Sequence, residues 1–180
     1  MNVVTRNFKS LSRKQSGATT MELLFYLIVA ALILYAAVQG GFKLFSRQSN
    51  NTEQENVASL IINTRALKGN TGYGTSGTNL VPVLSTTDGI PNGMTFTSGV
   101  PYNSWNGAVT VVSTGPSFTI TYPTVPQDAC VSLATRVAKN ASITTKINSG
   151  TGVVGEISAS SASTSCTDPT ANIISWTVSS

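Results

Sequence analysis

Residues 14–42 read KQSGATTMELLFYLIVAALILYAAVQGGF, and this segment sets the architecture of the chain. No charged residue occurs between Leu23 and Phe42. At about 1.5 Å per helical residue, these roughly 20 positions span about 30 Å, which is the thickness of the hydrocarbon core of a bilayer. The sequence therefore predicts a helix that can cross a membrane.

The residues before this helix predict its orientation and a processing site. Four cations and no acidic residue precede Gly17, and the positive-inside rule keeps such a flank in the cytoplasm. A secretory signal is cleaved after its apolar core, whereas the small residue here, Gly17, lies before it. Cleavage between Gly17 and Ala18 would leave the apolar helix on the mature protein. We therefore expect a membrane-bound precursor whose bulk lies outside the cytoplasm.

Glu22 is a carboxylate next to the apolar span, a costly position that makes it a functional-site hypothesis by default. Cleavage would create an α-amino group at Ala18, one helical turn before Glu22. The two groups could meet within one chain. Between packed copies, Glu22 could instead neutralise the next Ala18 amine and fix the axial register, as a lone polar residue does in a coiled coil. The competing interpretation is that Glu22 lies in the interface zone and extends to water.

These residues carry a family resemblance. The junction at Gly17, followed by a polar-to-apolar run with a glutamate at the fifth mature position, resembles the processing site of type IV prepilins. The leader length and the two cysteines in the C-terminal part resemble the type IVb branch. The stretches Asn56–Arg65, Gly72-Tyr73 and Trp105–Val111 are similar to the major pilins of conjugative thin pili and bundle-forming pili.

The resemblance implies a route of processing and assembly. A prepilin peptidase would cut after Gly17, and a cytoplasmic assembly ATPase with an inner-membrane assembly platform would insert the subunit into a homopolymer. The filament would leave through an outer-membrane secretin, so the precursor lies in the inner membrane and the product is an extracellular pilus on the cell surface. Ala18 stands where the family usually has a bulky apolar residue, which leaves N-methylation of the new terminus open.

The chain is expected to divide into four parts. They are a removed leader (residues 1–17), an apolar transmembrane and assembly half of helix one (18–42), an amphipathic half (43–68) and a globular head (69–180). Paired glycines in a helix are a plausible site of curvature or local melting, because each costs about 1 kcal/mol relative to alanine. We therefore expect flexibility at Gly40 and Gly41.

The amphipathic half shows one apolar face at helical spacing, which predicts packing against the head. This face consists of Val57, Leu60, Ile61, Thr64 and Leu67. The opposite face carries Arg47, Asn51, Glu53, Glu55 and Arg65. A cation followed by glycine is a helix stop signal, so we expect helix one to end at Lys68-Gly69.

The head is expected to be an antiparallel sheet, because short β-forming runs alternate with turn signals, among them Asp88-Gly89 and Asn106-Gly107. The expected strands are Leu80–Leu84, Met94–Thr97, Ala108–Ser113, Ser117–Tyr122 and Ile173–Val178. A further helix is expected at roughly Pro126–Ala141, with Cys130, Leu133, Val137 and Ala141 on one face. The resulting fold class is α+β, with the sheet packed on the amphipathic half of helix one.

Cys130 and Cys166 are the only cysteines, and two cysteines in an exported chain predict a disulfide. The bond would join the second helix to the segment Ser158–Ser165, whose Ser, Thr and Ala content resembles a flexible linker.

Composition argues against several function classes. Histidine is absent, so the chain has no Ser-His or Cys-His nucleophile pair. It also has no second cysteine pair that could bind a metal. We therefore expect no catalytic site, metal or cofactor. The leader holds four of the 11 lysines and arginines, so the mature chain has seven, equal to its seven acidic residues. Without a basic stripe, nucleic-acid binding is not expected.

These inferences lead to a structural subunit, a type IVb-like major pilin that self-assembles for adhesion, aggregation or conjugative contact. Two alternatives stay open. One is a minor pilin or a secretion-system pseudopilin. The other, from a different class, is a monomeric signal-anchored membrane protein with a ligand-binding head, which predicts no cleavage at Gly17.

Overall fold

The computed structural model describes residues 19–179, and for residues 39–47 it describes the backbone alone. The processing residues Gly17 and Ala18 lie outside this range. The chain forms two compact units, Met1–Phe42 and Lys43–Ser180, and each is described here by itself.

The first unit contains the start of α1, a helix of 47 residues that spans Thr20–Ala66. Its long apolar run is free of helix-breaking proline, which explains why the helix is uninterrupted. The helix continues through Gly40 and Gly41 without a break in its secondary structure. Their flexibility therefore stays a prediction.

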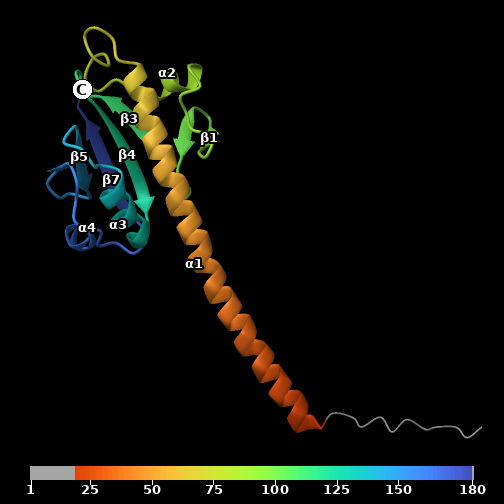
Figure 1. Cartoon of the computed structure of the whole chain (residues 1–180). Coiled ribbons are helices and arrows are strands. Elements are labelled where there is room, and N and C mark those ends of the chain that lie inside the picture. Colours follow the sequence, from red (N-terminus) through yellow and green to blue (C-terminus); the bar gives the residue numbers. More distant parts are fainter. Residues whose placement is uncertain (1–18, 180) are drawn as a thin grey trace, which may run out of the picture. The chain divides into compact units, whose positions relative to one another are not determined.

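The second unit is built on an antiparallel sheet of five strands in the order β3-β4-β7-β5-β6 (Figure 1). The strands are β3 (Thr110–Ser113), β4 (Phe118–Val125), β5 (Ile143–Ile147), β6 (Val153–Val154) and β7 (Asn172–Val178). A separate hairpin joins β1 (Thr95–Thr97) to β2 (Val100–Tyr102). Its two-residue turn has positive φ at both Ser98 and Gly99, which matches the twist of hairpin strands.

The two central strands show why this sequence forms a sheet with one buried face. Residues of β4 and β7 alternate between buried and more exposed, and the register pairs Ile120 with Trp176 and Tyr122 with Ile174. The Tyr122 and Trp176 rings lie edge to face with centroids 5.6 Å apart. On the other face, the Thr119 and Thr177 hydroxyls are hydrogen-bonded at 2.8 Å. The alternation thus supplies an apolar core on one side and polar pairs on the other.

The C-terminal part of α1 supplies the helical half of this core. Val57, Leu60 and Thr64 have no exposed surface, Ile61 is buried and Leu67 packs against the cluster. The predicted apolar face is therefore confirmed. The helix ends at Ala66, two residues before the predicted stop, and its last turn is closed by the N–H of Leu67 on the carbonyl of Thr64.

The segment predicted as a strand at Leu80–Leu84 is a short helix, α2 (Val81–Thr86), so that prediction was wrong. Pro82 lies in its first turn, where a missing N–H is tolerated. Asn79 Oδ1 accepts a hydrogen bond from the N–H of Val81 at 3.0 Å and helps the helix to begin. The buried residues Leu80, Val81 and Leu84 follow a helical spacing and not strict alternation.

Two more predictions in the C-terminal part need correction. The helix expected to reach Ala141 is shorter, α3 (Gln127–Arg136). Beyond it the chain turns at Asn140, whose side chain accepts from the N–H of Ser142. Ala141 is consequently exposed. The segment Ser158–Ser165 is not a flexible linker, since it contains α4 (Ala159–Ser165). Ser158 caps this helix by accepting from the N–H of Ser161, and Ala162 is buried beneath it.

The predicted disulfide is present. Cys130 in α3 and Cys166 after α4 are bonded, with their Cα atoms 6.0 Å apart, and neither residue has exposed surface. The bond joins the two helices within the buried core. The α+β class and the sheet-on-helix packing are also confirmed, although β2, β5, β6 and α4 were missed.

Candidate functional site

The described part of the first unit, taken by itself, is an apolar helix with an exposed surface. Every residue from Thr20 to Val38 is exposed, including the large side chains of Leu32, Leu34 and Tyr35. This span of 19 residues is long and apolar enough to cross a membrane. A buried core helix and a signal sequence near the N-terminus pass the same test of length and composition; this span lies near the N-terminus and has no buried residue. The surface therefore requires lipid or other apolar helices as its surroundings.

Glu22 lies in the first turn of α1 and is exposed. Its expected partner, the Ala18 amine, lies outside the described residues. The structure accordingly places Glu22 at the start of the apolar surface, and the pairing of the two groups stays a prediction.

The sequence analysis placed Glu53 on the wrong face of α1. Glu53, expected on the outward face of α1, has no exposed surface. Its Oε1 accepts hydrogen bonds from the backbone N–H of Ser104 at 2.7 Å and from the Ser104 hydroxyl at 2.6 Å. The helical spacing predicts this burial, because Glu53 precedes Val57 by four residues and Leu60 by seven and so lies on the same face of α1 as these two buried residues.

Ser104 belongs to a tightly organised loop between β2 and β3. The Asn103 side chain is buried, and its Oδ1 accepts from the N–H groups of Trp105 and Gly107. Its Nδ2 donates to the carbonyl of Pro123 at 2.8 Å. Side-chain to backbone bonds of this kind fix a loop without secondary structure. The loop thus holds Ser104 in place as the partner of Glu53.

The buried end of this polar cluster is Tyr122, whose hydroxyl donates to the sulfur of Met94 at 3.8 Å. Burial, and then the negative charge of Glu53, raise the pKa of the Tyr122 hydroxyl well above its usual value. The cluster therefore holds a neutral phenol next to a carboxylate inside the head. Its contacts connect α1 with the sheet, so we interpret it as a structural anchor.

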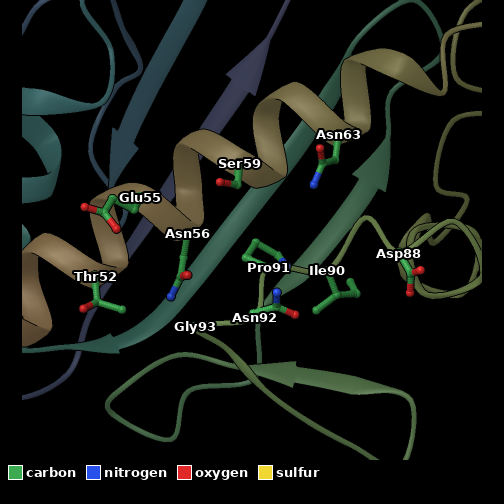
Figure 2. A pocket seen from close by; sticks show the side chains of 10 residues that line it. All are labelled: Thr52, Glu55, Asn56, Ser59, Asn63, Asp88, Ile90, Pro91, Asn92 and Gly93. Atoms are coloured by element: carbon green, nitrogen blue, oxygen red, sulfur yellow. The ribbon is translucent and has the colours of Figure 1, made fainter.

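A polar groove of about 640 Å³ lies between α1 and the loop that joins α2 to β1 (Figure 2). We call it the acidic groove, because the described residues of its lining include Glu55 and Asp88 but no lysine or arginine. Figure 2 shows the two carboxylates at opposite ends of the groove. It is lined by Thr52, Glu55, Asn56, Ser59, Asn63, Asp88, Ile90, Pro91, Asn92 and Gly93.

Asn56 marks the floor of the acidic groove. The residue is only 3% exposed, and its Nδ2 is buried without a hydrogen-bond partner. Gly93 packs so closely on its amide that a Cβ at position 93 would collide with Oδ1. The Nδ2 of neighbouring Asn63 does have a hydrogen-bond partner, because it donates to the carbonyl of Gly89 at 2.9 Å. Among the described residues, no group of histidine, cysteine or acidic side chains could hold a metal ion.

Comparisons with known proteins point in one direction. A family model described as PilS N terminal matches residues 47–179. The crystal structure of the type IV b pilin from Salmonella typhi is 31% identical, with a TM-score of 0.62, over 72% of this chain and 99% of that chain. TcpA, a type IV pilin from Vibrio cholerae El Tor biotype, is 13% identical with a TM-score of 0.51, over 73% of this chain and 99% of that chain. The latter likeness shows the fold alone. A search of curated proteins found no match.

Proposed function

Because this chain belongs to the PilS N terminal family and has the fold of a type IV pilin, the structural subunit of a pilus, we propose that it is the major subunit of a type IVb pilus. In this proposal, residues 1–17 are a leader that a prepilin peptidase removes after Gly17. An assembly ATPase and an inner-membrane platform then insert the mature subunit into a filament that leaves through an outer-membrane secretin. The filament serves adhesion, aggregation or conjugative contact at the cell surface.

The observation that carries the proposal is the fully exposed apolar surface of Thr20–Val38. At about 1.5 Å per residue this segment is about 28 Å long, which matches the hydrocarbon core of a membrane. Lipid covers the surface in the precursor, and the same segment of neighbouring copies covers it in the filament. Transfer from lipid to the filament does not expose this apolar surface to water, so it carries no large free-energy cost of apolar hydration.

Glu22 gives the filament its register in this proposal. Once Gly17 has been removed, the Ala18 amine and the Glu22 carboxylate of neighbouring copies neutralise each other among the packed helices. An unpaired carboxylate in that position would be costly, which favours the one axial offset that pairs it. The flexibility expected at Gly40 and Gly41 would let the apolar half adjust to its neighbours.

The test combines protein chemistry with one substitution. Filaments sheared from cells should contain a chain that begins at Ala18, as determined by N-terminal sequencing and intact mass, which would also show any added methyl group. Glu22→Gln should keep membrane insertion but lower the yield of filaments, because the amide has no charge to offer the amine. Glu156→Gln, at an exposed site in the head, is the matched control.

Three outcomes would count against the proposal. An uncut chain found only in the inner membrane would favour a monomeric anchor. Cleaved protein present in only trace amounts within filaments would favour a minor pilin or pseudopilin. Wild-type filament yield from Glu22→Gln would remove the register role while leaving assembly itself intact.

A further inference from the structure

Two surfaces of the head lie on opposite sides of the buried stripe of α1. Successive helical residues are turned by about 100°, so Asn56, Ser59 and Asn63 lie on one side of the stripe that contains Val57 and Leu60. These three residues line the acidic groove. On the same basis Asn50, Gln54 and Ala58 lie on the other side, where α3 packs. The Nε2 of Gln54 donates to the hydroxyl of Ser132 in α3 at 3.1 Å, which fixes that side.

The acidic groove has unsatisfied polar groups. The side chains of Glu55 and Asp88 have no hydrogen-bond or ion-pair partner among the side chains that the structure describes, those of residues 19–38 and 48–179. The buried Nδ2 of Asn56 also has no partner. Since the lining residues that the structure describes include two carboxylates and no lysine or arginine, the groove favours a cationic occupant and disfavours an anionic one.

The α3 side of α1 carries the complementary charge. Arg136 is exposed and lines two hollows there, one with Ala58 and Ile62 and the other with Asn50 and Ser132. Lys139 follows three residues later and is exposed too. In the described part of the chain neither cation has a hydrogen-bonding or ionic partner. We call Arg136 and Lys139 the basic corner.

Both surfaces also contain apolar area that a contact would bury. Ile62, beside Arg136, is 65% exposed, and Ile90 and Pro91 line the acidic groove. An interface needs such area in addition to charge, because complementary charges mainly set orientation and association rate.

We propose that the acidic groove of one copy receives the basic corner of the next copy, with Arg136 and Lys139 paired to Glu55 and Asp88. This inference rests on the proposed function, since it assigns a contact within the filament. The two surfaces lie on opposite sides of the buried stripe and cannot both face the same neighbour, so the contact is heterologous. A heterologous contact repeats as an open helix unless its rotation closes a ring. A second copy is favoured over another partner, because every chain carries one acidic groove and one basic corner, so the two complementary surfaces are present in equal number.

The test is a charge swap. Glu55→Arg and Arg136→Glu each place like charges in the contact, and each should lower the yield of sheared, sedimentable filaments by at least about tenfold, because like-charge juxtaposition at an interface is strongly unfavourable. The double variant Glu55→Arg/Arg136→Glu restores opposite charges and should recover filament yield to within about threefold of wild type. Glu156→Arg, which changes an exposed carboxylate elsewhere on the head, should assemble as wild type does.

A second measurement guards against variants that merely misfold. The chain with Glu55→Cys and Arg136→Cys should give an oxidation-dependent ladder of cross-linked subunits within filaments, whereas Glu156→Cys with Arg136→Cys should not. The native cysteines do not interfere, because both are buried in their disulfide. The proposal is overturned if the single reversals assemble normally, if the double variant is no better than the worse single variant, or if no ladder forms. Wild-type cells without any filament would instead overturn the proposed function, and this contact with it.

Discussion

Ser104 donates two hydrogen bonds to one oxygen of Glu53, from its backbone N–H at 2.7 Å and from its hydroxyl at 2.6 Å. The two residues are 51 positions apart in the chain and link α1 to the loop between β2 and β3. Bonds to a charged acceptor are stronger than neutral ones, and burial strengthens them further. This pair is therefore a strong polar connection between α1 and the rest of the head.

Glu53→Ala should lower the free energy of unfolding of the head by about 2–4 kcal/mol, because the N–H of Ser104 loses its acceptor and a cavity is left. The measurement is urea unfolding of the full chain in detergent, followed by tryptophan fluorescence, to which buried Trp176 contributes. Glu55→Ala is the control, since its side chain is exposed on the same helix and should change stability by less than about 0.5 kcal/mol. Equal effects of the two substitutions would contradict the anchoring role.

Alkaline pH should destabilise the head through Tyr122. Its pKa in the folded protein is raised above the ordinary value of 10.0, first by burial and then by Glu53. The unfolded chain thus releases this proton at a lower pH than the folded chain. The contribution of Tyr122 to the free energy of unfolding is complete below about pH 10. It is lost as the pH rises toward the pKa of Tyr122 in the folded protein, by at most about 1.4 kcal/mol per pH unit.

Tyr122→Phe isolates this effect. The variant should show a shallower loss of stability between pH 10 and about 11.5 than wild type, measured by urea unfolding at each pH. Its stability at neutral pH should change by less than about 1.5 kcal/mol, because the hydrogen bond of the hydroxyl to the Met94 sulfur is weak. Identical pH profiles for the two proteins would show that Tyr122 does not carry the alkaline sensitivity.

Removing the disulfide should cost about 3–4 kcal/mol of stability, since Cys130 and Cys166 close a loop with a sequence separation of 36. The paired variant Cys130→Ser/Cys166→Ser, compared with wild type in reducing and non-reducing urea titrations, measures this cost. Both cysteines are fully buried, so reductant and alkylating reagent should reach them only when the head unfolds. Rapid alkylation under native conditions would be incompatible with this structure.

Gly107→Ala should destabilise the head by about 1–3 kcal/mol through overpacking. A Cβ at this position would collide with the carbonyl oxygen of Pro123 and the hydroxyl of Thr124, and would lie 2.7 Å from the amide nitrogen of Asn103. Gly69→Ala is the matched control, because its Cβ would meet its nearest neighbour at 3.6 Å, an ordinary contact. Thermal unfolding of the two variants should separate them by several degrees.

Part of this fold could be read from periodicity. The alternation in β4 and β7, the apolar face of α1 and the turn signals at Asp88 and Asn106 are local properties, and both turn residues have positive φ in the structure. The disulfide followed from having just two cysteines. These features were predicted because each depends on residues close together in sequence or on a unique pairing.

The errors have a common cause. Leu80–Leu84 has the composition of a strand, but proline in the first turn and the acceptor on Asn79 favour α2. Ser158–Ser165 has the composition of a linker, but its cap and the neighbouring disulfide order α4. In each case a composition rule failed where specific hydrogen bonds or a covalent bond outweighed average propensity.

The sequence alone determined that the chain has an apolar helix long enough for a membrane, a glycine placed before it, one carboxylate at its start and an antiparallel head behind it. These are one-dimensional patterns, because length, charge and periodicity need no long-range contact to be recognised. Only the tertiary structure decided that Glu53 is buried on Ser104, that Asn56 and Asp88 share a groove, and that Arg136 lies on the other side of the buried stripe. Those relationships join residues from distant parts of the chain, and they arise when the apolar surfaces of the helix and the sheet are buried against each other.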